Sequence, residues 1–236
     1  MTNTQADPQI TPAAPDRRAI TWWWIAALFV VAVLIATVAV IFLTRSKQGT
    51  SQPGTPARCD VAPGAQTVPT TTPAGIEWRV SAGKTLLPYS SDSGPARVEG
   101  PLARCYAQDP VGSLLAASQI YGRVMGPNAA ESVRVAEEQV VPGPQRDRFI
   151  ASLSNPSTPP DQIQWRAFKF LSYTSDAARI DMVVESTATG AVAGIPMSLV
   201  WRDGDWQWDF ESFAPSDVHQ VDAADLSTYV PWSGVR

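Results

Sequence analysis

The sequence is poor in the residues that most active sites require. It contains one histidine, two cysteines and three lysines among 236 residues. So few histidines and cysteines cannot supply the spaced ligand cluster that defines a structural or catalytic metal site. No Gly-rich loop is followed by Lys and then Ser or Thr, so a phosphate-binding P-loop is absent. These absences argue against a metal or nucleotide cofactor, and we predict none.

Positive charge is also scarce. Lysine and arginine total 18 against 22 aspartates and glutamates, and no basic block stands out. Because nucleic-acid binding needs a concentrated positive surface, the charge pattern predicts that the protein does not bind nucleic acid. Arginine greatly outnumbers lysine, and Ala, Val and Pro are abundant, which is typical of proteins from high-GC bacteria.

Catalytic groups are hard to assemble from this sequence. His219 is the only histidine, and it lies near Asp217 and Asp222 in a polar C-terminal tail. A Ser-His-Asp arrangement is one interpretation, but a chain rich in Ser and Asp offers such sets without any function. We therefore predict an exposed histidine, no catalytic residues and no enzyme activity. Asp181 and Glu185 share one face of an expected strand. Two interpretations of these carboxylates are that they line the mouth of a cavity or that they face solvent, and we expect them to face solvent.

Charge is missing altogether from one long run, Trp22 to Leu43. A helix rises about 1.5 Å per residue, so this run matches the apolar thickness of a bilayer. The three tryptophans at its start favour the headgroup level. The rival interpretation is a cleaved signal peptide, whose apolar region spans about 7–15 residues and ends in a small-x-small site. This run is longer and lacks that site, so we predict a transmembrane helix over residues 19–44.

The flanking charges do not orient this helix, because basic residues lie on both sides of it. Other features favour an extracytoplasmic C-terminal part. Both cysteines follow the span, and a Pro/Thr/Gly-rich spacer would lift a domain off the membrane. We predict a disordered cytoplasmic tail over 1–18, a linker over 45–75 and an extracytoplasmic domain over 76–236 of a single-pass plasma-membrane protein.

The two cysteines, Cys59 in the linker and Cys105 in the domain, form a candidate disulfide. A cysteine in a flexible spacer has little packing role, and the other cysteine is its only partner within the chain. The bond would close a loop of about 46 residues and stabilise the fold by roughly 3–4 kcal/mol. Two independent thiols are the alternative.

Hydrophobic periodicity divides the expected domain into helices followed by strands. Short extended segments come first: Ile76 to Val80, Leu86 to Pro88 and Leu102 to Tyr106. Three helices follow: Pro110 to Met125, Ala129 to about Gln139 with Asn128 as its cap, and Gln145 to Leu153. Four strands complete the domain: Trp165 to Tyr173, Ala178 to Glu185, Ile195 to Arg202 and Trp206 to Phe213. Short connections predict an antiparallel meander, and the layout is α+β with three helices packed into a curved sheet.

Strict alternation in the first of these strands places Trp165, Ala167 and Lys169 on one face, with Phe168 and Phe170 on the other. Asp203-Gly204 predicts a hairpin turn, across which Trp201 and Trp206 pack. The tail that follows Ala214 and Pro215 is polar, and we expect its aromatic end to dock on the domain. Four tryptophans form either an aromatic interface or part of the core: Trp201, Trp206, Trp208 and Trp232.

A family resemblance rests on the order of these features and on short motifs. The motifs are Leu87-Pro88, Gly94-Pro95, Cys105-Tyr106, the helical stretch Pro110 to Ala117, the Gly-Asp-Trp hairpin within Val200 to Trp208, and the terminal Val230 to Gly234. Over residues 76–234 the chain resembles an actinobacterial single-span membrane protein family associated with integrative and conjugative elements, with an NTF2-like (VirB8/TcpC-like) ectodomain. The resemblance implies an NTF2-like cone and a structural subunit of a conjugation or type IV secretion-like channel.

Two functional hypotheses follow. The first is a membrane-anchored interaction protein, whose partners are the lipid bilayer and other membrane or secretion-complex proteins. This hypothesis is also compatible with a homo-oligomer. The second is an extracytoplasmic small-ligand-binding module, whose cone would hold a small apolar or envelope-derived molecule. An interior packed solid with Trp and Phe would count against the second hypothesis.

Overall fold

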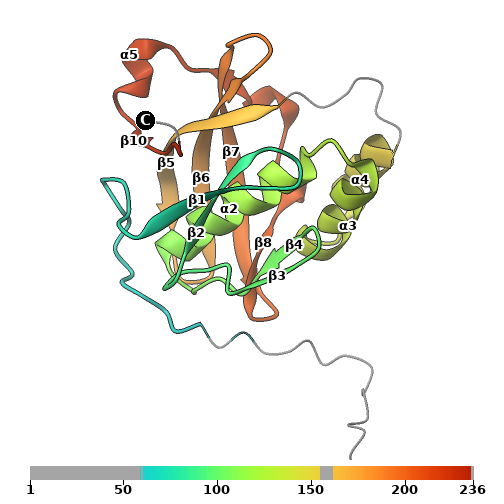
Figure 1. Ribbon diagram of the computed structural model, residues 1–236, viewed down its shortest axis with the longest axis horizontal. Helices are drawn as coiled ribbons and strands as arrows, with labels where there is room; N and C mark the ends of the chain where they lie inside the picture. The colour runs from blue at the N-terminus through green and yellow to red at the C-terminus, as the bar shows by residue number, and fades with distance from the viewer. Residues whose placement is uncertain (1–58, 60, 155–161, 235–236) are drawn as a thin grey trace, which may run out of the picture. The chain divides into compact units, whose positions relative to one another are not determined.

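A six-stranded antiparallel sheet organises the residues that this computed structural model describes, which are 59, 61–154 and 162–234 (Figure 1). The sheet runs in the order β10 (Val230–Pro231), β5 (Ile163–Tyr173), β6 (Ala177–Ser186), β7 (Val192–Arg202) and β8 (Asp205–Trp208), and the short β9 (His219–Gln220) also pairs with β7. Strands β5 to β8 follow one another along the chain and across the sheet. The predicted antiparallel meander is therefore confirmed.

The hairpin between β7 and β8 forms where the Asp-Gly pair predicts it. Asp203 and Gly204 both have positive φ, at 55° and 82°, as the two central residues of a type I′ turn require. Trp201 lies opposite Trp206 in the register, and their ring centroids are 5.4 Å apart. The turn thus sets the register that brings these two indoles edge to face across the strands.

Three helices cover one face of this sheet: α2 (Pro110–Val124), α3 (Ala129–Gln139) and α4 (Pro144–Ser154). Asp109 caps α2, where its carboxylate accepts the N–H of Gly112 at 2.6 Å. The Asn128 side chain caps α3 by accepting the N–H groups of Ala130 and Glu131. These side chains satisfy donors that a helix start leaves unpaired, which explains why the helices begin where the sequence predicts.

Helix α2 lies between the large sheet and two small hairpins. One hairpin pairs β1 (Ile76–Val80) with β2 (Leu86–Ser90), and the other pairs β3 (Arg97–Glu99) with β4 (Leu102–Arg104). The helix packs against β6, β7 and β8 on one side and against β2 and β4 on the other. Its Ala, Gly and Ser residues allow this close approach from both sides, so almost the whole helix is buried.

The strict alternation predicted for Trp165 to Tyr173 is wrong. The register of β5 shifts between Trp165 and Ala167, and again between Phe170 and Ser172. A bulge inserts one extra residue and reverses the faces that follow it. Trp165, Phe168 and Phe170 therefore all face the helices, while Ala167 faces the opposite side.

The fourth strand is shorter than predicted, because β8 ends at Trp208 and not at Phe213. The Asp209 side chain accepts the N–H of Glu211 at 3.2 Å, which starts the 3-10 turn η1 (Phe210–Ser212). An Asp side chain that bonds to the backbone two residues ahead competes with the strand ladder. Phe210 consequently leaves the strand and stacks on Phe149 of α4.

The C-terminal segment crosses the other face of the sheet. It contains η2 (Pro215–Asp217), β9, α5 (Ala223–Leu226) and β10. Val221 packs there against Ala167 and Val183 in a small second core. Trp232 then turns into the main core, where it is fully buried and donates its indole N–H to Ser118 Oγ at 3.0 Å. Docking of the aromatic end is confirmed.

The predicted membrane span over 19–44 and the predicted cytoplasmic tail over 1–18 lie outside the described residues. Within the described ranges, no helix is both long enough and apolar enough to cross a bilayer.

Candidate functional site

The linker is attached to the domain by a disulfide. Cys59 and Cys105 are bonded, with a Cα–Cα distance of 5.0 Å. Hydrogen bonds continue the attachment beyond the disulfide. The N–H of Gly64 donates to Asp109 Oδ2 at 2.8 Å, and the Thr72 hydroxyl donates to the Pro231 carbonyl at 2.9 Å. The second half of the predicted linker therefore lies along the domain, although residues 61–75 form no helix or strand.

Asp205 fixes the backbone at Cys105, the cysteine that the domain contributes to the disulfide. Its carboxylate accepts backbone N–H groups from Cys105 at 2.8 Å, from Tyr106 at 3.1 Å and from Trp206 at 3.0 Å. Burial raises the pKa of Asp205, and the three N–H donors oppose that rise. Cys105 has a φ of 67°, which is unfavourable for a residue with a side chain, so these bonds help to hold a strained backbone.

The positions of the four tryptophans show whether these side chains form an interface or part of the core. Trp206, Trp208 and Trp232 are buried, and Trp201 is half-buried against Trp206. Edge-to-face contacts link Trp208 to Tyr121, Phe149 and Phe210 between the sheet and the helices. These rings fill the space between the sheet and the helices. They act chiefly as core.

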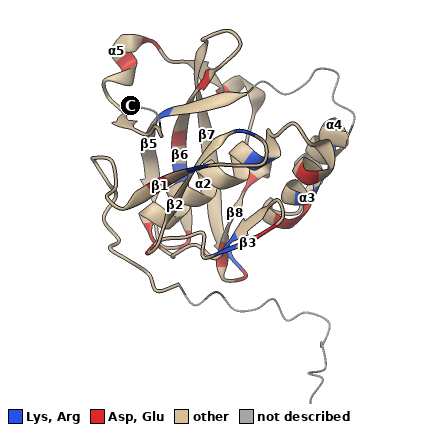
Figure 2. Cartoon of the chain, viewed as in Figure 1, with Lys and Arg blue, Asp and Glu red and all other residues tan. Residues whose placement is uncertain are grey.

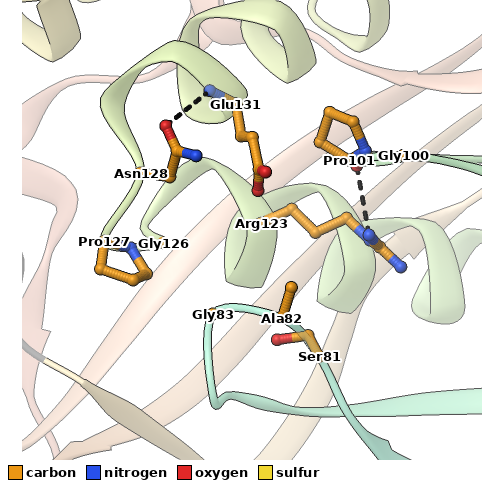
Figure 3. A pocket seen from close by; sticks show the side chains of 10 residues that line it. All are labelled: Ser81, Ala82, Gly83, Gly100, Pro101, Arg123, Gly126, Pro127, Asn128 and Glu131. Atoms are coloured by element: carbon orange, nitrogen blue, oxygen red, sulfur yellow. Dashed lines mark hydrogen bonds between the residues drawn. The ribbon is translucent and has the colours of Figure 1, made fainter.

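A cleft of about 270 Å³ opens at the surface where three turns meet (Figure 3). Its walls come from the β1–β2 turn, the β3–β4 turn and the corner between α2 and α3. The lining residues are Ser81, Ala82, Gly83, Gly100, Pro101, Arg123, Gly126, Pro127, Asn128 and Glu131. The walls are built mostly from Gly, Pro and Ala, so small side chains leave the hollow open. Arg123 and Glu131 are its two charged groups.

Arg123 crosses the floor of the cleft and ties three segments together. Its Nε donates to Gln119 Oε1 at 2.9 Å, Nη1 donates to the Pro101 carbonyl at 3.2 Å, and Nη2 donates to the Tyr89 hydroxyl at 3.1 Å. All three acceptors are neutral. Among the described residues no carboxylate forms an ion pair with Arg123, so the positive charge has no direct counter-ion there.

A second polar cluster lies under the C-terminal segment. Asp181 is only 3% exposed, which contradicts the prediction of a solvent-facing carboxylate. Its Oδ2 accepts the Tyr229 hydroxyl at 2.5 Å and lies 3.3 Å from His219 Nε2. The clamp formed by Asp181, His219 and Tyr229 joins the centre of the sheet to the tail. Burial and the Asp181 carboxylate raise the pKa of Tyr229, which keeps its hydroxyl a donor.

The surroundings of this clamp explain why the tail can approach so closely. Gly194 on β7 lies beneath the His219 ring, and a Cβ at that position would come within 2.5 Å of the ring atoms. Lys169, the cross-strand neighbour of Asp181, lies over the Tyr229 ring at 5.3 Å from its centroid. Glu185, the other carboxylate of the predicted face, is half-buried and pairs with Arg166 at 2.9 Å.

His219 is half-exposed, and the residues around it do not form a triad. Its Nε2 faces Asp181, and its Nδ1 lies 3.1 Å from the backbone carbonyl of Asp217. Both ring nitrogens therefore face acceptors, and neither contacts a hydroxyl nucleophile among the described residues. In the same part of the chain, no group of three His, Cys, Asp or Glu side chains converges as metal ligands would.

Sequence reasoning missed Asp205, Arg123 and Glu131 as site-forming residues. The signal for Asp205 was its place directly after the Asp203-Gly204 turn, but its partners lie about 100 residues away. Basic and acidic residues are interspersed over the described part of the chain rather than gathered on one element, so charge alone does not mark any of them (Figure 2).

These features define a disulfide-attached α+β domain with a densely packed aromatic core. The chain belongs to the family described as a domain of unknown function, DUF8175, whose sequence model matches residues 44–231. No curated protein and no solved structure matches the chain.

Proposed function

We propose that this protein is a membrane-anchored structural subunit of a conjugation or type IV secretion-like complex, and that its domain acts outside the cytoplasm through protein–protein contacts. The single observation that carries the proposal is the attachment of the linker. The Cys59–Cys105 disulfide bonds the linker to the domain, at a position that follows the uncharged run Trp22 to Leu43 in the sequence. Such a bond persists in an oxidising compartment, which supports a domain on the outer side of the membrane.

The packed interior supports an interaction role over the alternative, a small-ligand module with a central cavity. Rings fill the space between the sheet and the helices, as the contacts of Trp208 with Tyr121 and Phe149 illustrate. The order of three helices followed by an antiparallel meander also agrees with an NTF2-like unit, to which the two hairpins β1–β2 and β3–β4 are additions. We propose that fold family on this order.

Exposed apolar side chains supply positions at which partners can be captured. Val80 at the end of β1 is 69% exposed, and Leu171 on β5 is 50% exposed. A photo-crosslinking amino acid at either position replaces a side chain that packs little, so the fold should tolerate it. The full chain would be expressed in its host membrane and irradiated in intact cells. We expect adducts with membrane proteins of a transfer apparatus, or a band of twice the mass from a homo-oligomer.

The matched control is the same domain secreted without its anchor, carrying the crosslinker at the same position. The adducts should depend on the anchor, because tethering raises the local concentration of membrane partners. A tag at the C-terminus should be accessible to an external protease in sealed cells. Recovery of only the uncrosslinked monomer from both positions, or a protected C-terminal tag, would overturn the proposal.

A further inference from the structure

The cleft in Figure 3 contains two opposite charges that do not neutralise each other. Glu131 enters it from the first turn of α3, and Arg123 enters it from the last turn of α2. Both residues are half-buried. They form no ion pair with each other, and the Glu131 carboxylate makes no hydrogen bond to the rest of the described chain. Half-buried charges lose hydration, so a bound group of opposite charge would be favourable to each.

The structural roles of Arg123 and Glu131 do not account for the open cleft between them. The positive end of the α3 dipole stabilises Glu131 in the first helical turn, and Arg123 ties α2 to β2 and to the β3–β4 turn. Neither role requires an open hollow between them. A guanidinium has five N–H donors. The three hydrogen bonds that Arg123 donates within the described chain use one donor each, so two donors remain for another acceptor.

We propose that this cleft binds a small zwitterion of the amino-acid or short-peptide class. Its carboxylate contacts the remaining N–H groups of Arg123, and its ammonium contacts the carboxylate of Glu131. The volume of about 270 Å³ lies just below the roughly 300 Å³ at which drug-sized ligand pockets begin, which suits a smaller ligand such as an amino acid or a dipeptide. The Gly and Pro walls bring backbone groups close to such a ligand without side chains in the way.

Glycylglycine is a suitable probe because it carries both charges on a chain of the right size. The full-length protein, labelled with ¹⁵N-glycine and held in detergent micelles, provides built-in reporters. Gly83, Gly100 and Gly126 line the cleft, whereas Gly190 and Gly204 lie in turns elsewhere. We expect saturable shifts of the three cleft amides and none at the two distant ones. Removing either charge from the probe, as in N-acetyl-glycylglycine or glycylglycine amide, should weaken binding at least tenfold.

Two variants test the protein side, and a third serves as their control; none of them removes a hydrogen bond of Arg123. Glu131→Gln should weaken glycylglycine binding at least tenfold but leave the weak binding of N-acetyl-glycylglycine unchanged. Glu137→Gln removes the same charge from an exposed position of the same helix and should leave binding unchanged. Gly83→Ala adds a Cβ 3.1 Å from Pro127 Cδ, which narrows the cleft without changing its charge, and should also weaken binding.

Shifts that do not saturate, that are equal for all three probes, or that survive Glu131→Gln would overturn the zwitterion site. Such a result would leave the anchored interaction role untouched, since the crosslinks at Val80 and Leu171 do not depend on the cleft.

Discussion

The carboxylate of Asp205 accepts the backbone N–H of Cys105 at 2.8 Å, across 100 positions of the sequence. This bond fastens the β7–β8 hairpin to the residue that carries the disulfide. With the bonds from Tyr106 and Trp206, it makes one side chain the meeting point of the sheet, the β4–α2 connection and the linker.

Asp205→Asn should lower the free energy of unfolding by about 2–4 kcal/mol, because an amide NH₂ cannot accept the N–H groups that the carboxylate accepts. Urea denaturation of the purified protein measures this loss. The control is Asp203→Asn, two residues earlier at the exposed turn, where Asn also tolerates a positive φ and the change should stay below about 0.5 kcal/mol. Equal losses in the two variants would refute a special role for Asp205.

Cys59→Ser should destabilise the domain by about 4 kcal/mol, since the disulfide closes a loop of 46 residues in the unfolded chain. A reductant should lower the urea midpoint of the wild type and leave that of the variant unchanged. Non-reducing gels provide an independent readout, because the closed loop migrates faster than the open one. Two titratable thiols in the untreated protein would contradict this prediction.

Tyr229→Phe should cost about 1–3 kcal/mol, because it removes a donor from the buried Asp181 carboxylate. His219→Ala should cost less than about 1 kcal/mol, because the imidazole is half-exposed and solvent weakens its contact with Asp181. Amide hydrogen exchange at Val230 reports whether the tail detaches before the sheet unfolds. A larger loss for the His219 variant would show that the contact of His219 with Asp181, and not the tyrosine, holds the tail.

Alkaline pH should destabilise the fold, because it favours ionisation of tyrosines that are buried in the folded state. Burial raises the pKa of Tyr121 to about 12, whereas a tyrosine in the unfolded chain ionises near 10. Between about pH 10 and 12 Tyr121 therefore keeps its proton in the folded state and loses it in the unfolded state. The free energy of unfolding has its full value below about pH 10 and falls between pH 10 and 12. The loss from Tyr121 is at most about 3 kcal/mol.

Absorbance of the phenolate measures this titration directly, and Tyr121→Phe should remove one late-titrating group. Burial, with the charges of Asp109 and Asp176, also raises the pKa of Tyr173 to about 12. Burial likewise raises the pKa of Tyr106 and of Tyr229, so three late-titrating groups should remain in the variant. Ionisation of all five tyrosines together near pH 10 would be the contrary result.

The helices were predictable because their signals are local. Asp109 and Asn128 cap the next residues in the chain, and Pro110 fits the first helical turn. The faces of β5 were not predictable, because a bulge at Trp165 depends on how the neighbouring strand pairs and leaves no mark in the sequence.

Burial of polar groups escaped sequence reasoning for a related reason. The sequence pattern predicts that Asp181 faces solvent from its strand. The C-terminal tail folds back over this carboxylate and removes it from water. The cleft between Arg123 and Glu131 likewise needs three turns to meet that are separated along the chain.

The sequence by itself determined the uncharged run before Cys59, the α+β order of elements and the turn at Asp203-Gly204, because each depends on residues within a few positions of one another. The tertiary structure alone decided that Asp205 holds Cys105, that Tyr229 covers Asp181 and that the tryptophans form core. Those outcomes arise from contacts across roughly 50 to 100 residues, where burial and hydrogen-bond satisfaction override the local pattern.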